Sequence, residues 1–360
     1  MPNGTSFEVR RDDLRRSRFT EQALSDPAPG EVELRVDRFA LTANNVTYAV
    51  AGDAMRYWSF FPAEAGWGRV PVWGFADVAR SSVPELAAGE RIYGYFPMAT
   101  HLVVRPDSLG PAGFVDGAPH RAGLPLVYNQ YRRVAADPGY DVALEDRQAV
   151  LQPLFITGWL LADLVVDEGA GGRRVLVASA SSKTGIALAA SLARAGVQGV
   201  EVVGLTAPHN APFVEKLGCY DRIVPYDAIS DLPTDESAIL VDMAGNAAVK
   251  SAVHAHFGAR LARSISVGVT HWEQGSLRPP ELPGPKPEFF FAPARIQKRS
   301  QEWGARALQQ RMGEAWRAFA EDSRRWLEIE LGRGREQVAG HWLATVDGSA
   351  RPDRGLILQL

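Results

Sequence analysis

A run of hydroxyl side chains and one lysine, between Ser179 and Gly185, has the chemistry of an anion-binding turn. Its candidate ligands are Ser179, Ser181, Ser182, Lys183 and Thr184. Hydroxyl and backbone N–H groups donate hydrogen bonds to phosphate oxygens, and a lysine supplies the opposite charge. The turn holds a single glycine, so it lacks the dinucleotide fingerprint G-x-G-x-x-G. An ordinary strand-to-helix turn, capped by Ser182 with nothing bound, remains the alternative.

The flanking residues predict elements that would position this turn. The apolar run Val175–Ala178 is typical of a strand buried on both faces, and the alanine-rich segment 186–196 predicts a helix that ends at Gly196. A second apolar strand follows at 200–206. The unit is therefore β-α-β, half of a mononucleotide-binding fold.

The end of the second strand indicates which nucleotide would bind. Strands selective for NAD usually end in Asp or Glu, which binds the ribose 2′-hydroxyl. Here the strand ends in Thr206, His209 and Asn210, whose side chains are able to form hydrogen bonds, and no acid precedes Glu215. We therefore expect NADPH to be preferred over NADH.

The rest of the chain predicts two domains. After a short helix at 210–218, apolar segments at 222–226, 238–245 and 261–270 predict three more strands of an open parallel sheet, which places its ligand at the strands' carboxyl ends. Residues up to about 107 are β-rich, with alternation at 30–42 and short strands at 72–80, 91–96 and 101–105. That spacing predicts a small, partly open barrel.

Aromatic residues crowd between Tyr48 and Phe96, above all in Tyr57-Trp58-Ser59-Phe60-Phe61. In a loop, so many adjacent rings are hard to bury together. We expect Tyr57, Trp58 and Phe61 to line an apolar substrate cleft. The alternative is that they fill the core of the barrel.

Composition excludes several classes of protein. The chain has 360 residues, is 46% hydrophobic and carries a net charge of -3, so no basic field favours a nucleic-acid partner. Its one cysteine, Cys219, excludes a disulfide framework and a zinc site built on several thiolates. We found neither a leader-like apolar start nor a run approaching the ~18 apolar residues of a membrane span. We therefore expect a cytoplasmic protein without a membrane partner.

Several short motifs, taken in order, resemble those of one known family. They are Ala43–Gly52, Val175–Gly185, Thr206–Gly218, Ile223–Tyr226, Val241–Gly245 and Ser266–Gly268. The chain resembles the zinc-independent medium-chain dehydrogenase/reductases of the quinone oxidoreductase and enoyl reductase branch, and within them the divergent DUF2855 family. The resemblance implies an α/β fold, with a Rossmann-type doubly wound parallel sheet domain (146–285) and a GroES-like β-barrel substrate domain (1–145) completed by 286–360.

The resemblance also implies roles for individual residues. Cofactor binding would involve Ser179, Ser181, Ser182, Lys183, Thr184, Thr206, Asn210, Tyr226, Gly245 and Gly268. This chain departs from the family where Ser182 and Lys183 replace two glycines of the turn. Asn210 stands where many NADPH-using relatives carry Lys or Arg, a loss for which Lys183 or Arg222 could compensate. No zinc ligands of the alcohol dehydrogenase branch are present, so no metal is expected.

The activity implied is NADPH-dependent reduction of an activated C=C bond or a quinone-like carbonyl in a small apolar or aromatic substrate. Tyr48 is the first candidate for the proton donor, Asn45 or Asn44 would orient the substrate carbonyl, and Tyr128 is a further candidate at the substrate. A core tyrosine with a satisfied hydroxyl is the alternative for Tyr48. Rival functions are a catalytically silent nucleotide-binding or sensor protein and, disfavoured by the charge, an RNA binder. Relatives also suggest a homodimer.

Overall fold

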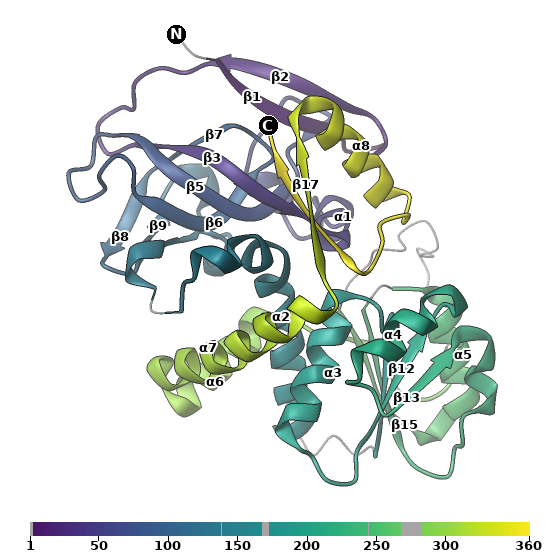
Figure 1. The fold of residues 1–360 in the computed structure, drawn as a ribbon. Helices are drawn as coiled ribbons and strands as arrows, with labels where there is room; N and C mark the ends of the chain where they lie inside the picture. Colours follow the sequence, from purple (N-terminus) through teal and green to yellow (C-terminus); the bar gives the residue numbers. More distant parts are fainter. Residues whose placement is uncertain (1–2, 138, 168–172, 244, 268–281) are drawn as a thin grey trace. The chain divides into compact units, whose positions relative to one another are not determined.

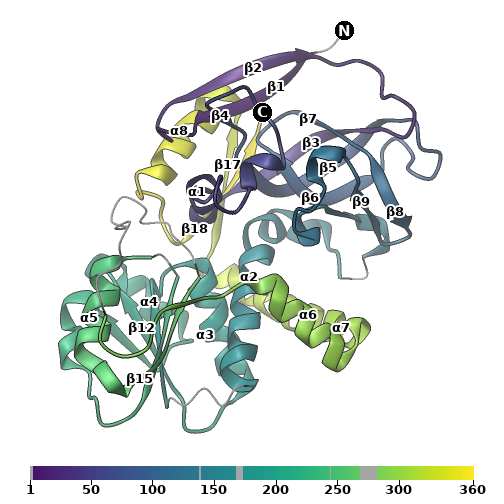
Figure 2. The same ribbon diagram turned by 180° about the vertical axis from the view of Figure 1, so that it is seen from behind.

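A computed structural model describes residues 3–137, 139–167, 173–243, 245–267 and 282–360. The chain forms two compact units, one from Met1–Val150 with Glu328–Leu360 and the other from Leu151–Leu327 (Figures 1 and 2). The second unit therefore continues past residue 285, where a domain boundary was expected. It continues because two further helices, described below, pack within it.

The second unit is built on a parallel sheet. Its strands are β11 (Arg174–Ala178), β12 (Glu201–Thr206), β13 (Arg222–Pro225), β14 (Ala238–Asp242), β15 (Leu261–Ser266) and β16 (Glu288–Phe289). They lie in the order β13-β12-β11-β14-β15-β16, with every neighbouring pair parallel. The chain leaves β11 toward β12 and later returns to the other side of β11 with β14. This is the doubly wound arrangement, and the predicted β-α-β unit is confirmed.

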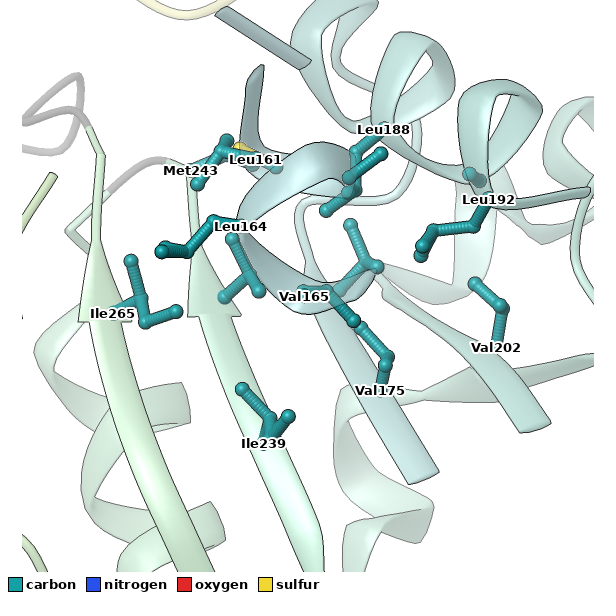
Figure 3. Close-up of a cluster of buried hydrophobic side chains, with 14 residues drawn as sticks. Leu161, Leu164, Val165, Val175, Leu188, Leu192, Val202, Ile239, Met243 and Ile265 are labelled. Atoms are coloured by element: carbon teal, nitrogen blue, oxygen red, sulfur yellow. The ribbon is translucent and has the colours of Figure 1, made fainter. Parts of the chain in front are cut away.

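Helices α2 (Glu145–Asp167), α3 (Lys183–Ala195), α4 (Ala211–Leu217) and α5 (Ala247–Phe257) flank the two faces of this sheet. Two more helices, α6 (Ala292–Trp303) and α7 (Ala305–Asp322), pack against α2 through the Arg295–Asp163 ion pair and the Phe155–Trp316 ring contact. Alternation along β11 explains the layers. Val175 and Val177 pack with Leu161 of α2 and Leu188 of α3 on one face (Figure 3). Leu176 packs on the opposite face in a second cluster, which includes residues of α5.

The helix α2 is both long and apolar. The segment Val142–Asp167 is long and apolar enough to cross a membrane by length and composition, with a mean hydropathy of 1.8 over an 18-residue window. The expectation that no stretch approaches such a span is therefore wrong. Within the structure, 61% of that window is buried, as in the core helix of a globular unit.

Two mostly antiparallel sheets make up the first unit. One holds β3 (Val32–Leu41), β5 (Pro71–Ser81), β6 (Arg91–Pro97), β7 (His101–Val104), β8 (Pro106–Gly110), β9 (Gly113–Asp116), β10 (Gln130–Arg133), β17 (Glu328–Arg333) and β18 (Arg354–Gln359). The other holds β1 (Asn3–Arg10), β2 (Ser17–Ala23) and β4 (Trp67–Gly68). Two helices, α1 (Ala43–Val50) and α8 (Gly334–Val346), complete the unit.

Local expectations in the first unit need two corrections. The alternation at 30–42 predicts Glu33 on the exposed face of its strand, yet Glu33 is 3% exposed, because Arg80 and His101 cover it from the neighbouring strands β5 and β7. The sequence pattern also predicts a change toward helix from residue 128 onward. Residues 130–133 instead form β10, because they pair with β9 and β6, and the helix begins only at Glu145.

Candidate functional site

The turn between β11 and α3 has a backbone shape set by a few contacts. Ser179 has a φ of 58°, a left-handed conformation that a non-glycine residue rarely adopts. Ser182 is the N-cap of α3, and its hydroxyl accepts a hydrogen bond from the Gly185 N–H at 3.1 Å. A Cβ added at Gly185 would lie 3.0 Å from the Ser179 carbonyl oxygen, so this position requires its glycine.

Tyr226 closes the turn from the end of β13, which lies beyond β12 in the sheet. It follows β13, and its hydroxyl accepts from the Ser179 N–H at 3.2 Å and lies 3.3 Å from the Ser179 hydroxyl. Burial raises the pKa of Tyr226, so its hydroxyl stays protonated at neutral pH. Ser179 and Tyr226, both predicted to bind the cofactor, thus lie together, but the Ser179 N–H already donates to Tyr226.

Further groups with the chemistry to bind an anion lie at the start of α3. Ser181, Lys183 and Thr184 are partly exposed there. The first N–H groups of a helix have no intrahelical acceptor, and the helix dipole is positive at this end. The turn can therefore present donors and positive charge to an anion, while Ser182 uses its hydroxyl in the cap.

The end of β12 carries no carboxylate. Thr206 is 1% exposed, and its hydroxyl oxygen has no hydrogen-bond partner among the described residues. Asn210 follows in a short 3-10 turn (Pro208–Asn210) and is half-buried. Arg222, the other residue suggested to compensate, is exposed and pairs with Val203, three residues before the carboxyl end of β12.

The carboxyl ends of β14 and β15 hold a charged cluster. The Gly245 N–H donates to Asp242 Oδ1 at 2.9 Å, and the ammonium of Lys250 lies 3.0 Å from Asp242 Oδ2 and 3.0 Å from the Ser266 hydroxyl. Gly245 was a predicted cofactor residue, and Gly268 lies outside the described residues. Sequence reasoning missed Lys250, because nothing in its position on α5 signals that it reaches the sheet edge.

In the first unit, α1 separates the roles of two neighbouring asparagines. The Asn45 side chain accepts from the Thr42 N–H at 2.7 Å and donates to the Pro71 carbonyl at 2.8 Å, and Asn45 is 3% exposed. Both ends of its amide therefore hold the backbone. Asn44 is partly exposed and interacts with the Tyr48 hydroxyl.

Tyr48 lies in a cluster of aromatic side chains. Its ring centroid is 4.6 Å from that of Tyr57, 5.6 Å from that of Tyr95 and 6.1 Å from that of Tyr128. The Tyr48 hydroxyl accepts from Trp73 Nε1 at 3.4 Å. Burial raises the pKa of Tyr48, and the interactions with Trp73, Asn44 and Tyr128 offset this only in part.

The predicted substrate residues are more buried than expected. Tyr57, Trp58 and Phe61 are 6%, 4% and 3% exposed, so the argument that adjacent rings in this segment are hard to bury together is wrong. They are buried because a 3-10 turn (Tyr57–Ser59) points the rings in different directions, some toward Tyr95. Tyr128 is partly exposed, and its hydroxyl lies 3.2 Å from that of Tyr57.

Tyr95 is a member of this cluster that sequence reasoning did not single out. It is fully buried, and its hydroxyl has no hydrogen-bond partner among the described residues. It pairs across strands with Trp73, whose ring centroid lies 5.1 Å away. Strand alternation alone could have placed Trp73 and Tyr95 on one face, but their register depends on the pairing of β5 with β6. As for metals, the described part of the chain contains no group of three or more potential metal ligands.

Comparison with known proteins gives one family and a set of similar folds. The model of a family described as "Protein of unknown function (DUF2855)" matches residues 39–351. No curated protein matches the chain. Among solved structures, CurA from Vibrio vulnificus in complex with NADPH is 14% identical with a TM-score of 0.60, covering 99% of this chain and 98% of that one.

Two further structures have the same fold. The yhdH oxidoreductase from Salmonella enterica in complex with NADP is 13% identical with a TM-score of 0.54, and the coverage is 99% of both chains. The CurK enoyl reductase is also 13% identical, with a TM-score of 0.55 and 99% coverage of both chains. At these identities the likeness concerns the fold.

Proposed function

We propose that this chain, which belongs to the DUF2855 family, is an NADPH-dependent oxidoreductase that reduces an activated C=C bond or a quinone-like carbonyl of a small apolar substrate. The observation that carries the proposal is the turn after β11. It lies at the point where the strand order reverses, which is where open α/β sheets bind their ligands. The NADP(H)-bound neighbours of the same fold support this choice of cofactor.

The residues of the second unit fit such a cofactor. Ser181, Lys183 and Thr184 would bind the pyrophosphate at the start of α3. The Thr206 hydroxyl, which has no hydrogen-bond partner among the described residues, would lie near the adenosine ribose together with Asn210. Because no carboxylate lies at this strand end, a 2′-phosphate could be accommodated there. Tyr226 would hold the turn in shape through Ser179.

The first unit would supply the proton. NADPH, when bound, provides a hydride for an electron-poor carbon of the substrate. Tyr48 would donate its proton to the oxygen or carbon that gains negative charge. Burial raises its pKa and so opposes this step, whereas the interactions with Trp73 and Asn44 lower the pKa and would favour the phenolate left behind. Asn44 and Trp73 would orient the Tyr48 hydroxyl, and Asn45 would hold α1 in place.

The aromatic cluster supports an apolar or aromatic substrate. Within it Tyr128 and Trp73 are partly exposed, so we propose that these two rings contact the substrate. Tyr57 and Phe61 would support them within the cluster, whereas Trp58 lies outside it, against Gly52, Gly68 and Arg11. Stacking on aromatic rings favours a flat, conjugated substrate over a flexible aliphatic one.

Two measurements test this function. Titration of the tryptophan fluorescence with NADPH and with NADH should give micromolar binding of NADPH and much weaker binding of NADH. A screen of enones and quinones should then reveal loss of nicotinamide absorbance. If neither nucleotide binds, the proposal is wrong.

The role of Tyr48 is tested by removing its hydroxyl. Tyr48→Phe should lower kcat about tenfold or more and leave the Kd for NADPH unchanged, since a positioned proton donor contributes at least that much. Tyr140→Phe is the matched control, because Tyr140 donates to Glu145 outside the cluster. Equal turnover in both variants would remove Tyr48 from the mechanism.

A catalytically silent nucleotide-binding protein is the second candidate. One observation favours it, namely that Tyr226 already occupies the Ser179 N–H in a turn with only one glycine. Micromolar NADPH binding without turnover across the enone and quinone screen would support this candidate over the reductase.

We also propose that the protein is a cytoplasmic homodimer with no nucleic-acid partner. The edge strand β16 supports an interface, because Phe289 on it is 55% exposed and Phe291 just beyond it is 38% exposed. Light scattering on the purified protein should give twice the mass of 39.2 kDa. A monomer at micromolar concentration would contradict the assembly.

A further inference from the structure

The cluster formed by Lys250, Asp242 and Ser266 lies at the carboxyl edge of the parallel sheet, where open α/β sheets bind their ligands. The proposed function does not yet give this cluster a role. Asp242 is the last residue of β14, Ser266 is the last residue of β15, and Lys250 reaches both from α5. The turn after β11 is on one side of the reversal in strand order, and β14 begins the other side. A dinucleotide bound across that reversal extends over both.

The geometry holds the Lys250 ammonium in one place. Its nitrogen lies 3.0 Å from Asp242 Oδ2 and 3.0 Å from the Ser266 hydroxyl. The Asp242 side chain is 3% exposed and its other oxygen accepts from the Gly245 N–H, so the anion itself is fixed. A flexible lysine side chain is therefore held at the carboxyl edge by two strand ends.

The ammonium has donor capacity beyond these two contacts. A lysine carries three N–H donors. Among the described residues the Ser266 hydroxyl accepts one of them, and Asp242 Oδ2 is the ion-pair partner of the ammonium. The Lys250 side chain is 19% exposed, which leaves it reachable from the edge of the sheet. A neutral or anionic oxygen acceptor placed there would complete its hydrogen bonds.

We infer that Lys250 binds the nicotinamide half of the cofactor, by donating a hydrogen bond to an oxygen of the ribose or of the carboxamide. This inference rests on the proposed NADPH site. It assigns the two halves of the dinucleotide to two sides of the sheet, with the adenosine half at the turn after β11 and the nicotinamide half at Lys250. Asp242 and Ser266 are then positioning residues that act through Lys250.

The test compares a whole cofactor with half of one. Lys250→Met removes the donor, and we expect the Kd for NADPH to rise about tenfold, the typical effect of losing a hydrogen bond to a charged group. The Kd for 2′,5′-ADP, which lacks the nicotinamide half, should change less than twofold. An equal change for both ligands would show a merely structural lysine and overturn the inference, as would no change for either.

A matched variant separates binding from folding. Lys250→Met leaves Asp242 buried without its ion pair, which destabilises the protein. The double variant Asp242→Asn/Lys250→Met removes both charges, so it should fold and show the same selective loss of NADPH affinity. If the double variant binds NADPH as the wild type does, Lys250 is not a ligand. If the wild type fails to bind NADPH, even though it binds 2′,5′-ADP, the proposed function fails as well.

Discussion

The neighbours Asn44 and Asn45 show what a motif can and cannot assign at the scale of a residue. The sequence allowed either one to occupy the same functional position. The fold gives the two asparagines different contacts. The Asn45 side chain accepts from the Thr42 N–H at the start of α1 and donates to the carbonyl of Pro71, 26 residues later in the chain, whereas Asn44 interacts with Tyr48. Pro71 belongs to the strand β5, whereas Asn45 lies in α1, so no local sequence pattern could have revealed this hydrogen bond.

We expect the two asparagines to differ in what they control. Asn45→Ala leaves the Pro71 carbonyl and the Thr42 N–H without their partner, which should lower the free energy of unfolding by about 1–3 kcal/mol. Asn44→Ala should leave stability within about 0.5 kcal/mol and lower turnover. Urea unfolding of both variants, beside turnover, distinguishes them. If Asn44→Ala is the destabilised variant, the assignment is reversed.

At the scale of elements, β11, β12 and α3 were predictable because their patterns are local. Apolar runs and the glycine stop at Gly196 determine them, and Gly196 does adopt the left-handed conformation, with a φ of 60°. Helix-on-helix packing was not predictable. It depends on Gly158 in α2, where an added Cβ would lie 2.7 Å from Ala187 Cβ and 2.7 Å from the Leu188 backbone nitrogen.

Gly158→Ala should therefore destabilise the protein although alanine favours helices. The clash with the α3 backbone should cost about 1–3 kcal/mol, and a shifted α3 should also weaken NADPH binding at its first turn. Gly313→Ala in α7 is the control, because an added Cβ there meets nothing within 4 Å. That change should stabilise the protein by up to about 1 kcal/mol. Two variants of equal stability would contradict the close packing of α2 on α3.

Ion pairs between α2 and α6 lead to a prediction about pH. Hydrogen bonds from Lys298, Arg299 and Arg295 lower the pKa of Asp167 in the folded state. A carboxyl with a lowered pKa stabilises the fold above its unfolded pKa, near 3.8, and loses that contribution as the pH falls further. Asp167→Asn should therefore be less stable than the wild type at pH 7, and the difference should shrink below pH 3.8. The exposed Asp227→Asn is the control and should change the stability at pH 7 less than Asp167→Asn does.

At the scale of the whole molecule, the order of the two kinds of unit was predictable, because β-rich and α/β patterns occupy separate stretches. The point at which the chain re-enters the first unit, at Glu328, was harder to predict. Helical spacing runs from residue 301 onward, yet α6 and α7 pack within the second unit through contacts such as Phe155 with Trp316 at 5.6 Å. Those contacts join residues far apart in sequence, so periodicity alone did not place the boundary.

The discontinuous first unit should depend on both ends of the chain, whereas the second unit should fold alone. Deleting residues 328–360 removes β18, which bonds to β3, and Trp342, which is 1% exposed and donates to the Leu14 carbonyl. We expect that truncated chain to lose the cooperative unfolding of its first unit. A fragment spanning 145–327 keeps α2 and the whole parallel sheet, so it should unfold cooperatively and bind 2′,5′-ADP as the full chain does. Calorimetry of both truncated chains measures their cooperative unfolding, and fluorescence titration measures their binding of 2′,5′-ADP. A fragment that folds but fails to bind would mean that the first unit supplies part of the adenosine site, which the hydrogen bond between Ser179 and Tyr226 within the second unit argues against.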